Sequence, residues 1–229
     1  MSLTLTISVL KSFGELRYRH FGLGYLAGTI YALGRSTEAK RLLWECLTQQ
    51  ELIGDPRTIP HMLYHIRGIY DLMDTALGLE ARRVLQTIIP ICRENADDWG
   101  VAISSSQLGY THCRLGEYDE AERCFREGLQ AAIKLPTFQM ALEALVGLIL
   151  LSIKLGPPSP EKQKWAITGL TLVLNHPATT RPTYDRAAAL LAGVEETGLR
   201  PEVVAAARKQ AQTLKLETLV EEILSVIAG

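Results

Sequence analysis

The stretch 102–135 constrains the fold of this chain more than any other part of its sequence. It contains two segments with the hydrophobic period of an α-helix, separated by Leu-Gly-Glu. Gly116 in this separator favours a turn, because a residue without a Cβ adopts the left-handed conformation that ends a helix at little cost. Leu108 and Phe125 fall where two paired helices would face each other. The stretch therefore predicts a helical hairpin.

This hairpin resembles a tetratricopeptide repeat, whose pattern is W-x2-L-G-x2-Y…A-x3-F. The matching residues are Leu108, Gly109, Ala121 and Phe125. The resemblance implies that Gly109 and Ala121 are small so that two helix backbones can approach. Three residues depart from the pattern at its Trp, Tyr and small positions and make this a divergent repeat: Ser105, His112 and Gly128.

Weaker copies of the pattern occur on both sides of this hairpin. Three further units are expected at about 17–56, 59–95 and 137–175, with turns near Gly34, 74–79 and 156–160. Residues 1–16 are interpreted as the remnant of a preceding repeat, which suggests a longer native chain. The repeat array then covers 17–177.

Residues 178–229 contain three more helical patterns, at about 183–197, 201–213 and 217–227. We interpret this part as a C-terminal helical cap, since a stack of repeats needs a more polar end to stay soluble. The sequence therefore predicts an all-α, right-handed superhelical solenoid of about four hairpins with a C-terminal cap.

Units of about forty residues followed by the segment 165–196 are similar to the C-terminal sensor arrays of bacterial signal-transduction ATPases and transcriptional regulators. The resemblance implies that this chain is the sensing or interaction part of such a protein, or a stand-alone relative of it. The modules that accompany these arrays are not visible: there is no G-x-x-x-x-G-K-[ST] motif and no recognisable basic recognition helix.

Composition argues against several classes of function. The chain has 229 residues, 47% of them hydrophobic, so disorder is not expected. Its formal net charge of −1 gives no general attraction for nucleic acids or anionic membranes, and no apolar run is long enough to span a bilayer. The four cysteines form no C-x-x-C pair and are expected to be small buried residues in a reducing compartment. A cytoplasmic protein is therefore predicted.

Catalytic and metal-binding motifs are weak. His61 and His65 share a helix face at the spacing of a two-histidine metal site, but they lack nearby cysteine or carboxylate ligands, so packing is favoured. His112 and Cys113 are adjacent and point in different directions on a helix, which argues against a catalytic dyad. We expect no enzyme, no metal site and no cofactor. Core packing is also expected for the tryptophans, Trp44, Trp99 and Trp165.

The surface is the remaining candidate for function. In tetratricopeptide stacks the first helix of each unit lines the concave face. The resemblance therefore assigns a mixed set of side chains to that face: Phe21, Tyr31, Met62, His65, Ile69, Tyr110, Arg114 and Glu143. For Met62 and Ile69, burial between units is an almost equally good interpretation. Tyr110 would supply an aromatic anchor and Arg114 paired hydrogen bonds to a carboxylate.

Two functions of different classes fit these observations. The first is a non-catalytic module that presents its concave face to a peptide, a protein segment or a small regulatory ligand, without nucleic acid or membrane as a partner. The alternative is an oligomerisation or scaffolding element that pairs with another copy of itself and takes no small ligand.

Overall fold

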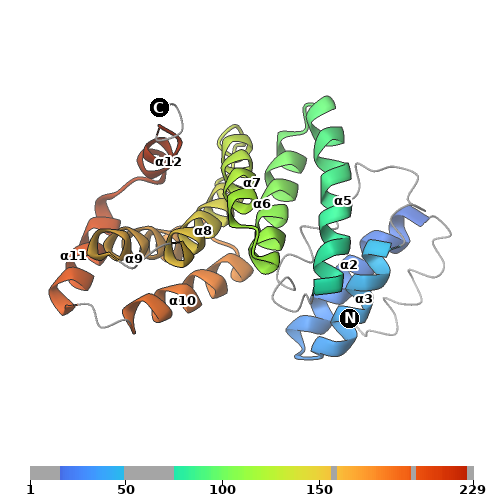
Figure 1. The fold of residues 1–229 in the computed structure, drawn as a ribbon, viewed down its shortest axis with the longest axis horizontal. Coiled ribbons are helices and arrows are strands. Elements are labelled where there is room, and N and C mark those ends of the chain that lie inside the picture. Colours follow the sequence, from blue (N-terminus) through green and yellow to red (C-terminus); the bar gives the residue numbers. More distant parts are fainter. Residues whose placement is uncertain (1–15, 49–74, 156–158, 197–199, 226–229) are drawn as a thin grey trace.

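The computed structural model describes residues 16–48, 75–155, 159–196 and 200–225. These residues form helices joined by short turns and contain no strand, which confirms the predicted all-α class for the described part of the chain. The helices follow one another across Figure 1, from α2 and α3 at one end to α9 and α10 at the other. The handedness of the stack and the division of the chain at residues 16 and 177 stay predictions.

The helices agree closely with the periodic segments of the sequence. In chain order they are α2 (Leu16–Ala32), α3 (Ser36–Thr48), α5 (Thr75–Glu94), α6 (Asp98–Leu115), α7 (Tyr118–Ala132), α8 (Gln139–Lys154), α9 (Pro160–Asn175), α10 (Arg181–Glu195), α11 (Pro201–Thr213) and α12 (Leu216–Ser225).

Local sequence explains where several of these helices begin and end. The carboxylate of Asp97 accepts a hydrogen bond from the backbone N–H of Gly100 at 2.8 Å and caps the start of α6. Gly116 ends α6 with a φ of 78°, in the left-handed conformation expected from the sequence. Gly34 has a φ of 77° between α2 and α3. The Ser159 hydroxyl caps α9, and Pro160 occupies its first position.

One expected turn, at 74–79, is wrong for residues 75–79, which belong to helix α5. The apolar stripe of this helix begins at Leu77, which is 1% exposed, and continues through Ala81, Leu85 and Ile88. Gly78 lies inside this helix, where a glycine costs only about 1 kcal/mol, which packing readily offsets. The helix expected before that turn, with Met62, His65 and Ile69, lies outside the described residues.

Pairing between neighbouring helices builds the stack. Helix α6 packs against α5, α7 and α8, while α9 packs against α8, α10 and α11. Helix α12 packs against α7. In Figure 1 it lies above α9, whereas α10 lies below α9. The turns near Gly34 and Gly116 are confirmed. Helix α8 ends at Lys154 and α9 begins at Pro160, the last residue of the turn expected at 156–160.

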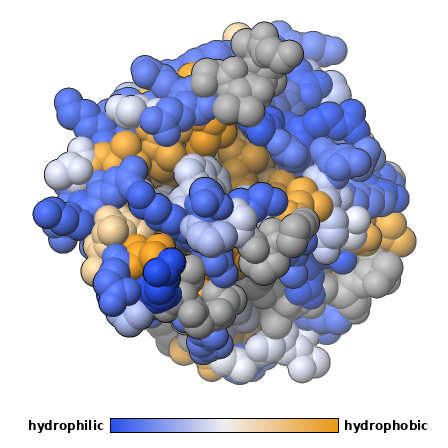
Figure 2. Space-filling view, turned by 60° about the vertical axis from the view of Figure 1, so that its left-hand side comes forward, coloured by the Kyte–Doolittle hydropathy of each residue, from blue (hydrophilic) through white to orange (hydrophobic). Residues whose placement is uncertain are grey.

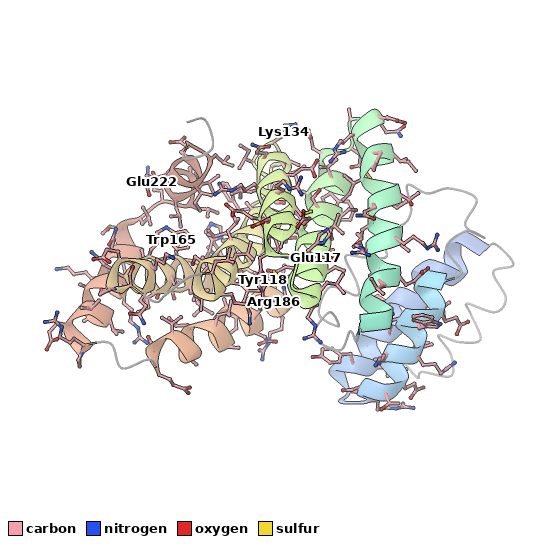
Figure 3. The ribbon with its side chains drawn as sticks, viewed as in Figure 1. Glu117, Tyr118, Lys134, Trp165, Arg186 and Glu222 are labelled. Atoms are coloured by element: carbon pink, nitrogen blue, oxygen red, sulfur yellow. The ribbon has the colours of Figure 1, made fainter. Side chains whose placement is uncertain are left out.

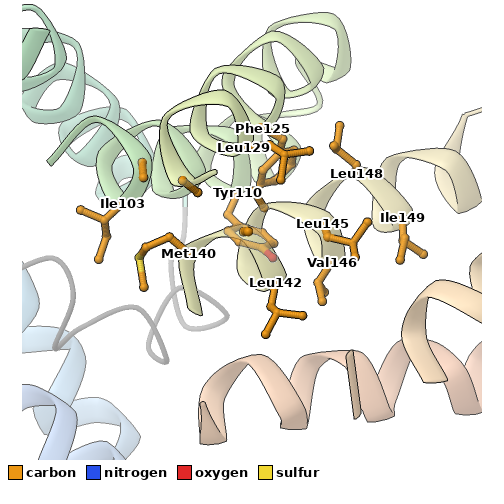
Figure 4. Packing of buried hydrophobic residues seen from close by; sticks show 14 of the residues in the cluster. Ile103, Tyr110, Phe125, Leu129, Met140, Leu142, Leu145, Val146, Leu148 and Ile149 are labelled. Carbon is orange, nitrogen blue, oxygen red and sulfur yellow. The ribbon is translucent and has the colours of Figure 1, made fainter. Parts of the chain in front are cut away.

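Phe125 of α7 is the centre of the core and has no exposed surface. Its ring lies against Gly109 of α6 and Gly147 of α8, so glycine at both positions makes room for the aromatic side chain. Figure 4 shows Phe125 beside Leu129 and Tyr110, with the side chains of α8 leaving that helix in several directions. The interior of this part of the stack is therefore filled from three helices at once.

Ala121→Leu is expected to destabilise the fold by roughly 1–3 kcal/mol, because added methylene groups at a closely packed position strain both neighbouring helices. Ala121 is fully buried, at 0% exposure. Urea denaturation followed by circular dichroism measures the change. A denaturation curve equal to that of the wild type would show that the α7 backbone does not need a small residue there.

The tryptophans and cysteines divide between interior and surface. Trp99 and Trp165 are half-buried against the core, whereas Trp44 is 44% exposed, so the packing expected for Trp44 is only partial.

Cys92 is buried, and burial raises its pKa to about 11, as expected for an inert thiol. Cys113 and Cys124 are half-buried free thiols with pKa values raised by burial to about 11 and about 12. The side chain of Cys46 lies outside the described residues.

Candidate functional site

The residues assigned to the concave face lie in very different surroundings. Tyr31 is half-buried against the core at the end of α2, and Arg114 is exposed near the end of α6. Tyr110 and Glu143 are buried, with exposures of only 4% and 1%. The side chain of Phe21 and all of Met62, His65 and Ile69, together with His61, lie outside the described residues.

Tyr110 and Glu143 do come together, at the place where α6, α8 and α10 meet. The Tyr110 hydroxyl donates a hydrogen bond to the backbone carbonyl of Glu143 at 2.9 Å. Its ring meets Phe125 edge to face, with the centroids 4.8 Å apart. The guanidinium of Arg186, on α10, lies over the Tyr110 ring, with its Cζ atom 4.0 Å from the ring centroid. Burial raises the pKa of the Tyr110 hydroxyl, which keeps it a hydrogen-bond donor.

Glu143 places a carboxylate in the interior beside this ring. The side-chain amide of Gln107, on α6, donates a hydrogen bond to Glu143 Oε1 at 2.8 Å. Arg186 Nη1 lies 3.9 Å from the same oxygen. A buried carboxylate is costly unless a cation and hydrogen bonds compensate it; here Arg186 supplies the cation and Gln107 a hydrogen bond to Oε1. We call Gln107, Tyr110, Glu143 and Arg186 the buried polar cluster.

The buried polar cluster differs from the open face that the sequence suggested. Helix α10 brings Arg186 over Tyr110, so a partner has no direct access to Tyr110 or Glu143 in this arrangement. One signal for the burial of Glu143 was present in the sequence: α8 is strongly apolar, as is typical of a helix buried on most of its surface. Whether these residues bind a partner stays a prediction.

His112, which replaces the tyrosine of the repeat pattern, has a structural partner. Its Nδ1 lies 2.5 Å from Glu117 Oε2, and Arg82 of α5 donates a hydrogen bond to Glu117 Oε1 at 2.7 Å. These hydrogen bonds, from His112 above all, lower the pKa of Glu117. The contacts join α5 to the turn between α6 and α7. They give His112 a structural role in this junction.

A groove on α7, α8, α9 and α12 is the second candidate site. Its volume is about 400 Å³. The lining combines an apolar floor with polar side chains: Glu122, Arg126, Leu148, Leu151, Ser152, Leu155, Trp165, Glu222 and Ile223. Figure 3 labels Trp165 on α9 and Glu222 on α12, and Figure 2 shows apolar surface between hydrophilic residues on the face turned toward the viewer. We call it the Trp165 groove.

Arg126 fixes the position of α12 along one wall of the Trp165 groove. Its Nε donates to Glu122 Oε1 at 2.8 Å, and its Nη1 donates to the backbone carbonyl of Ile223 at 2.9 Å. A cation at the last carbonyls of a helix is stabilising, because the helix dipole is negative there. The apolar side of α12 is buried through Leu216 and Leu219. The groove therefore has a defined wall and an apolar floor able to receive side chains of a partner.

The sequence did not identify this groove. Arg126 and Ile223 are separated by 97 positions, and no local pattern links them. Trp165 was expected only to pack.

Within the described residues, no group of three or more His, Cys, Asp or Glu side chains is placed to hold a metal ion. None of the helices described is both long and apolar enough to cross a membrane.

The comparisons with known proteins identify one part of the chain. A family model described as "Tetratricopeptide repeat" matches residues 101–135, which coincide with α6 and α7. The comparisons with curated proteins and with solved structures gave no match. The match confirms the repeat predicted for this hairpin. It does not test the resemblance to bacterial sensor arrays.

Proposed function

Because residues 101–135 match a tetratricopeptide repeat, we propose that this chain is a non-catalytic module that binds a peptide or protein segment. Proteins of this kind generally mediate interactions with other proteins, using surfaces that stacked helices create. The observation that carries the proposal is the Trp165 groove. Its volume of about 400 Å³ falls within the range of about 300–1,000 Å³ found for ligand sites.

The composition of the Trp165 groove supports a protein partner. Leu155 and Trp165 are half-buried and line the groove above the buried Leu148 and Leu151, and Trp165 belongs to the residue types that most often dominate binding energy. Polar side chains at its edge, such as Glu122 and Ser152, resemble the polar rim of a protein interface.

The concave face predicted from the sequence is a second proposed surface. Arg114 is exposed and Tyr31 is half-buried, and both remain proposed contacts of a peptide or a small regulatory ligand, together with the other residues named for that face. Involvement of Tyr110 and Glu143 would require α10 to move, because Arg186 covers Tyr110.

The cellular setting is also a proposal. The length of the units and the segment 165–196 support a role as the sensing or interaction part of a bacterial signalling or transcription-regulating protein in the cytoplasm. The alternative function is an oligomerisation or scaffolding element without a small ligand. Light scattering coupled to size exclusion separates the two, because only the alternative requires self-association.

Panning a displayed library of random peptides against the full chain tests the proposed function. Trp165→Ala is expected to weaken the binding of enriched peptides about tenfold or more, the loss typical of an interface anchor. Ser152→Phe should block the groove by filling it, since Ser152 lines it and is half-buried. Fluorescence anisotropy with labelled peptides measures the affinities.

Ile153→Phe is the matched control, because Ile153 neighbours Ser152 on α8, is 39% exposed and does not line the groove. This variant should bind like the wild type. If the enriched peptides bound the folded variants Trp165→Ala, Ser152→Phe and Ile153→Phe with equal affinity, the binding site would lie elsewhere. If panning enriched no peptide, the result would argue against a binding module.

A further inference from the structure

We propose that a partner protein docks an amphipathic helix on the surface that α12 covers, and that this helix displaces α12. That surface lies around Arg126 of α7 and Gly169 of α9, and we call it the α12 seat. The proposal rests on the proposed function and adds the kind of partner and the place where it binds.

Helix α12 has the pattern of a docked amphipathic helix. Its apolar residues recur at helical spacing, and Leu216, Leu219 and Val220 are buried, with exposures of 3%, 2% and 4%. Residues on the opposite side, such as Glu217 and Thr218, are exposed. A helix of ten residues is marginal by itself in water, so contacts with the stack hold it. The α12 seat is therefore shaped for one side of a helix.

The contacts of the α12 seat can be made by a helix of another sequence. Arg126 donates a hydrogen bond to the backbone carbonyl of Ile223, in the last turn of α12, at 2.9 Å. Every helix has carbonyls without an internal partner in its last turn, so a partner helix that ends here offers Arg126 the same acceptor. Leu219 lies beside Gly169, with its Cδ2 atom 3.8 Å from the place of an added Cβ. The seat thus requires an apolar side and a helix end.

Helix α12 does not fill the space beside it. Ile223 and Trp165 both line the Trp165 groove, whose volume is about 400 Å³, and Ile223 is only half-buried. A larger apolar residue at the position of Ile223, such as phenylalanine, would extend into the groove and bury more apolar area. A partner helix with such a residue gains contacts that α12 lacks.

This gain is needed because α12 belongs to the same chain. Only residues 214 and 215 join it to α11. A segment on a short connection competes at an effective concentration in the millimolar range. A partner helix with the same side chains as α12 would therefore bind weakly, whereas one that also fills the Trp165 groove can displace α12. The partner chemistry is an apolar stripe like that of α12, with a large residue near its C-terminal end.

Three peptides of residues 214–225, with blocked ends, test the proposal on the wild-type chain. One has the natural sequence and one carries Ile223→Phe. The third carries Thr218→Phe, the matched control, which adds the same ring on the exposed side of the helix. Fluorescence anisotropy should show the Ile223→Phe peptide binding about tenfold more tightly than the other two. Equal affinities of the two phenylalanine peptides would overturn the proposal.

Hydrogen exchange shows whether α12 leaves its seat. With saturating Ile223→Phe peptide, the backbone amides of α12 in the chain should exchange at least about tenfold faster, because a displaced short helix loses its protection. Amides of α5, which does not line the groove, should not change. Unchanged or slower exchange in α12 would mean that the peptide binds beside this helix, which overturns the displacement.

Leu219→Asp in the full chain should release α12, because an unpaired carboxylate is costly to bury. The natural peptide should bind this variant about tenfold more tightly than the wild type, since α12 no longer competes. Thr218→Asp is the matched control on the exposed side and should bind the peptide like the wild type. A folded Leu219→Asp chain that binds no better than the control would overturn the proposal. The measurements on the wild-type chain do not depend on this variant.

The remaining outcomes separate this proposal from its rivals. A dimer of the wild-type chain, seen by light scattering and abolished by Leu219→Asp, would assign the α12 seat to a second copy and overturn the partner helix. Library peptides that depend on Trp165 but leave α12 protected would overturn the displacement and leave the binding module in place. No binding of library peptides or of the three helical peptides would contradict both.

Discussion

Arg186→Met is expected to lower the free energy of unfolding by about 3 kcal/mol at neutral pH, since removal of one partner leaves a buried charge uncompensated. The Arg186 side chain is 11% exposed, with its guanidinium 4.0 Å from the Tyr110 ring centroid and 3.9 Å from Glu143 Oε1. Methionine keeps most of the apolar volume but cannot balance the carboxylate. Urea denaturation of the full chain measures the loss.

Two further variants separate electrostatics from packing at this position. Adding Glu143→Gln to Arg186→Met should recover most of the loss, because a neutral amide needs no cation beside it. Arg181→Met is the matched control: Arg181 is an exposed arginine of the same helix, paired with Asp185 at 2.8 Å on the surface. The control should leave stability unchanged within error. Equal behaviour of Arg186→Met and Arg181→Met would contradict the buried polar cluster.

Gly147→Ala is expected to destabilise the protein by about 3 kcal/mol, at the upper end of the usual cost of overpacking a core. A Cβ at Gly147 would lie closer than 3.0 Å to ring carbons of Phe125, a separation that real Cβ atoms essentially never show. The ring cannot move away easily, because Gly109 touches it from α6 and it has no exposed surface. The measurement is again urea denaturation.

Gly193→Ala is the control for the change from glycine to alanine. Gly193 lies inside α10, where an added Cβ would have no neighbour within 4 Å. Alanine should therefore stabilise this helix by about 0.5–1 kcal/mol. Adding Phe125→Leu to Gly147→Ala should restore part of the loss by relieving the overlap. If Gly147→Ala were as stable as Gly193→Ala, the close packing of α7 on α8 would be refuted.

The hairpin formed by α6 and α7 was predictable because its signals are local. Gly116 ends a helix by its own conformation, and Leu108 and Phe125 follow a helical period that identifies the packed side. The turn expected at 74–79 was placed by alignment with the other units; its residues can form either a turn or the start of a helix, and residues 75–79 form the start of α5. Local pattern does not separate these cases when packing decides between them.

The candidate site was less predictable, since it depends on contacts between distant segments. Alignment placed Tyr110 and Glu143 near each other, as the structure has them, but nothing in their own segments showed that Arg186 would cover Tyr110. The same applies to the Trp165 groove, whose wall exists because Arg126 binds the end of α12. The boundaries of a helix depend on residues close in sequence, whereas the exposure of a side chain depends on how all the helices pack together.

Chemical-shift mapping by NMR with an enriched peptide tests the binding module most directly. The account predicts that the peptide shifts the indole N–H signal of Trp165 and the backbone signals of Ser152 and Ile223, which line the groove. Signals of Ile153, outside the lining, should shift much less. Shifts confined to Tyr31 and Arg114, with Trp165 unchanged, would contradict the groove and move the site to the concave face predicted from the sequence.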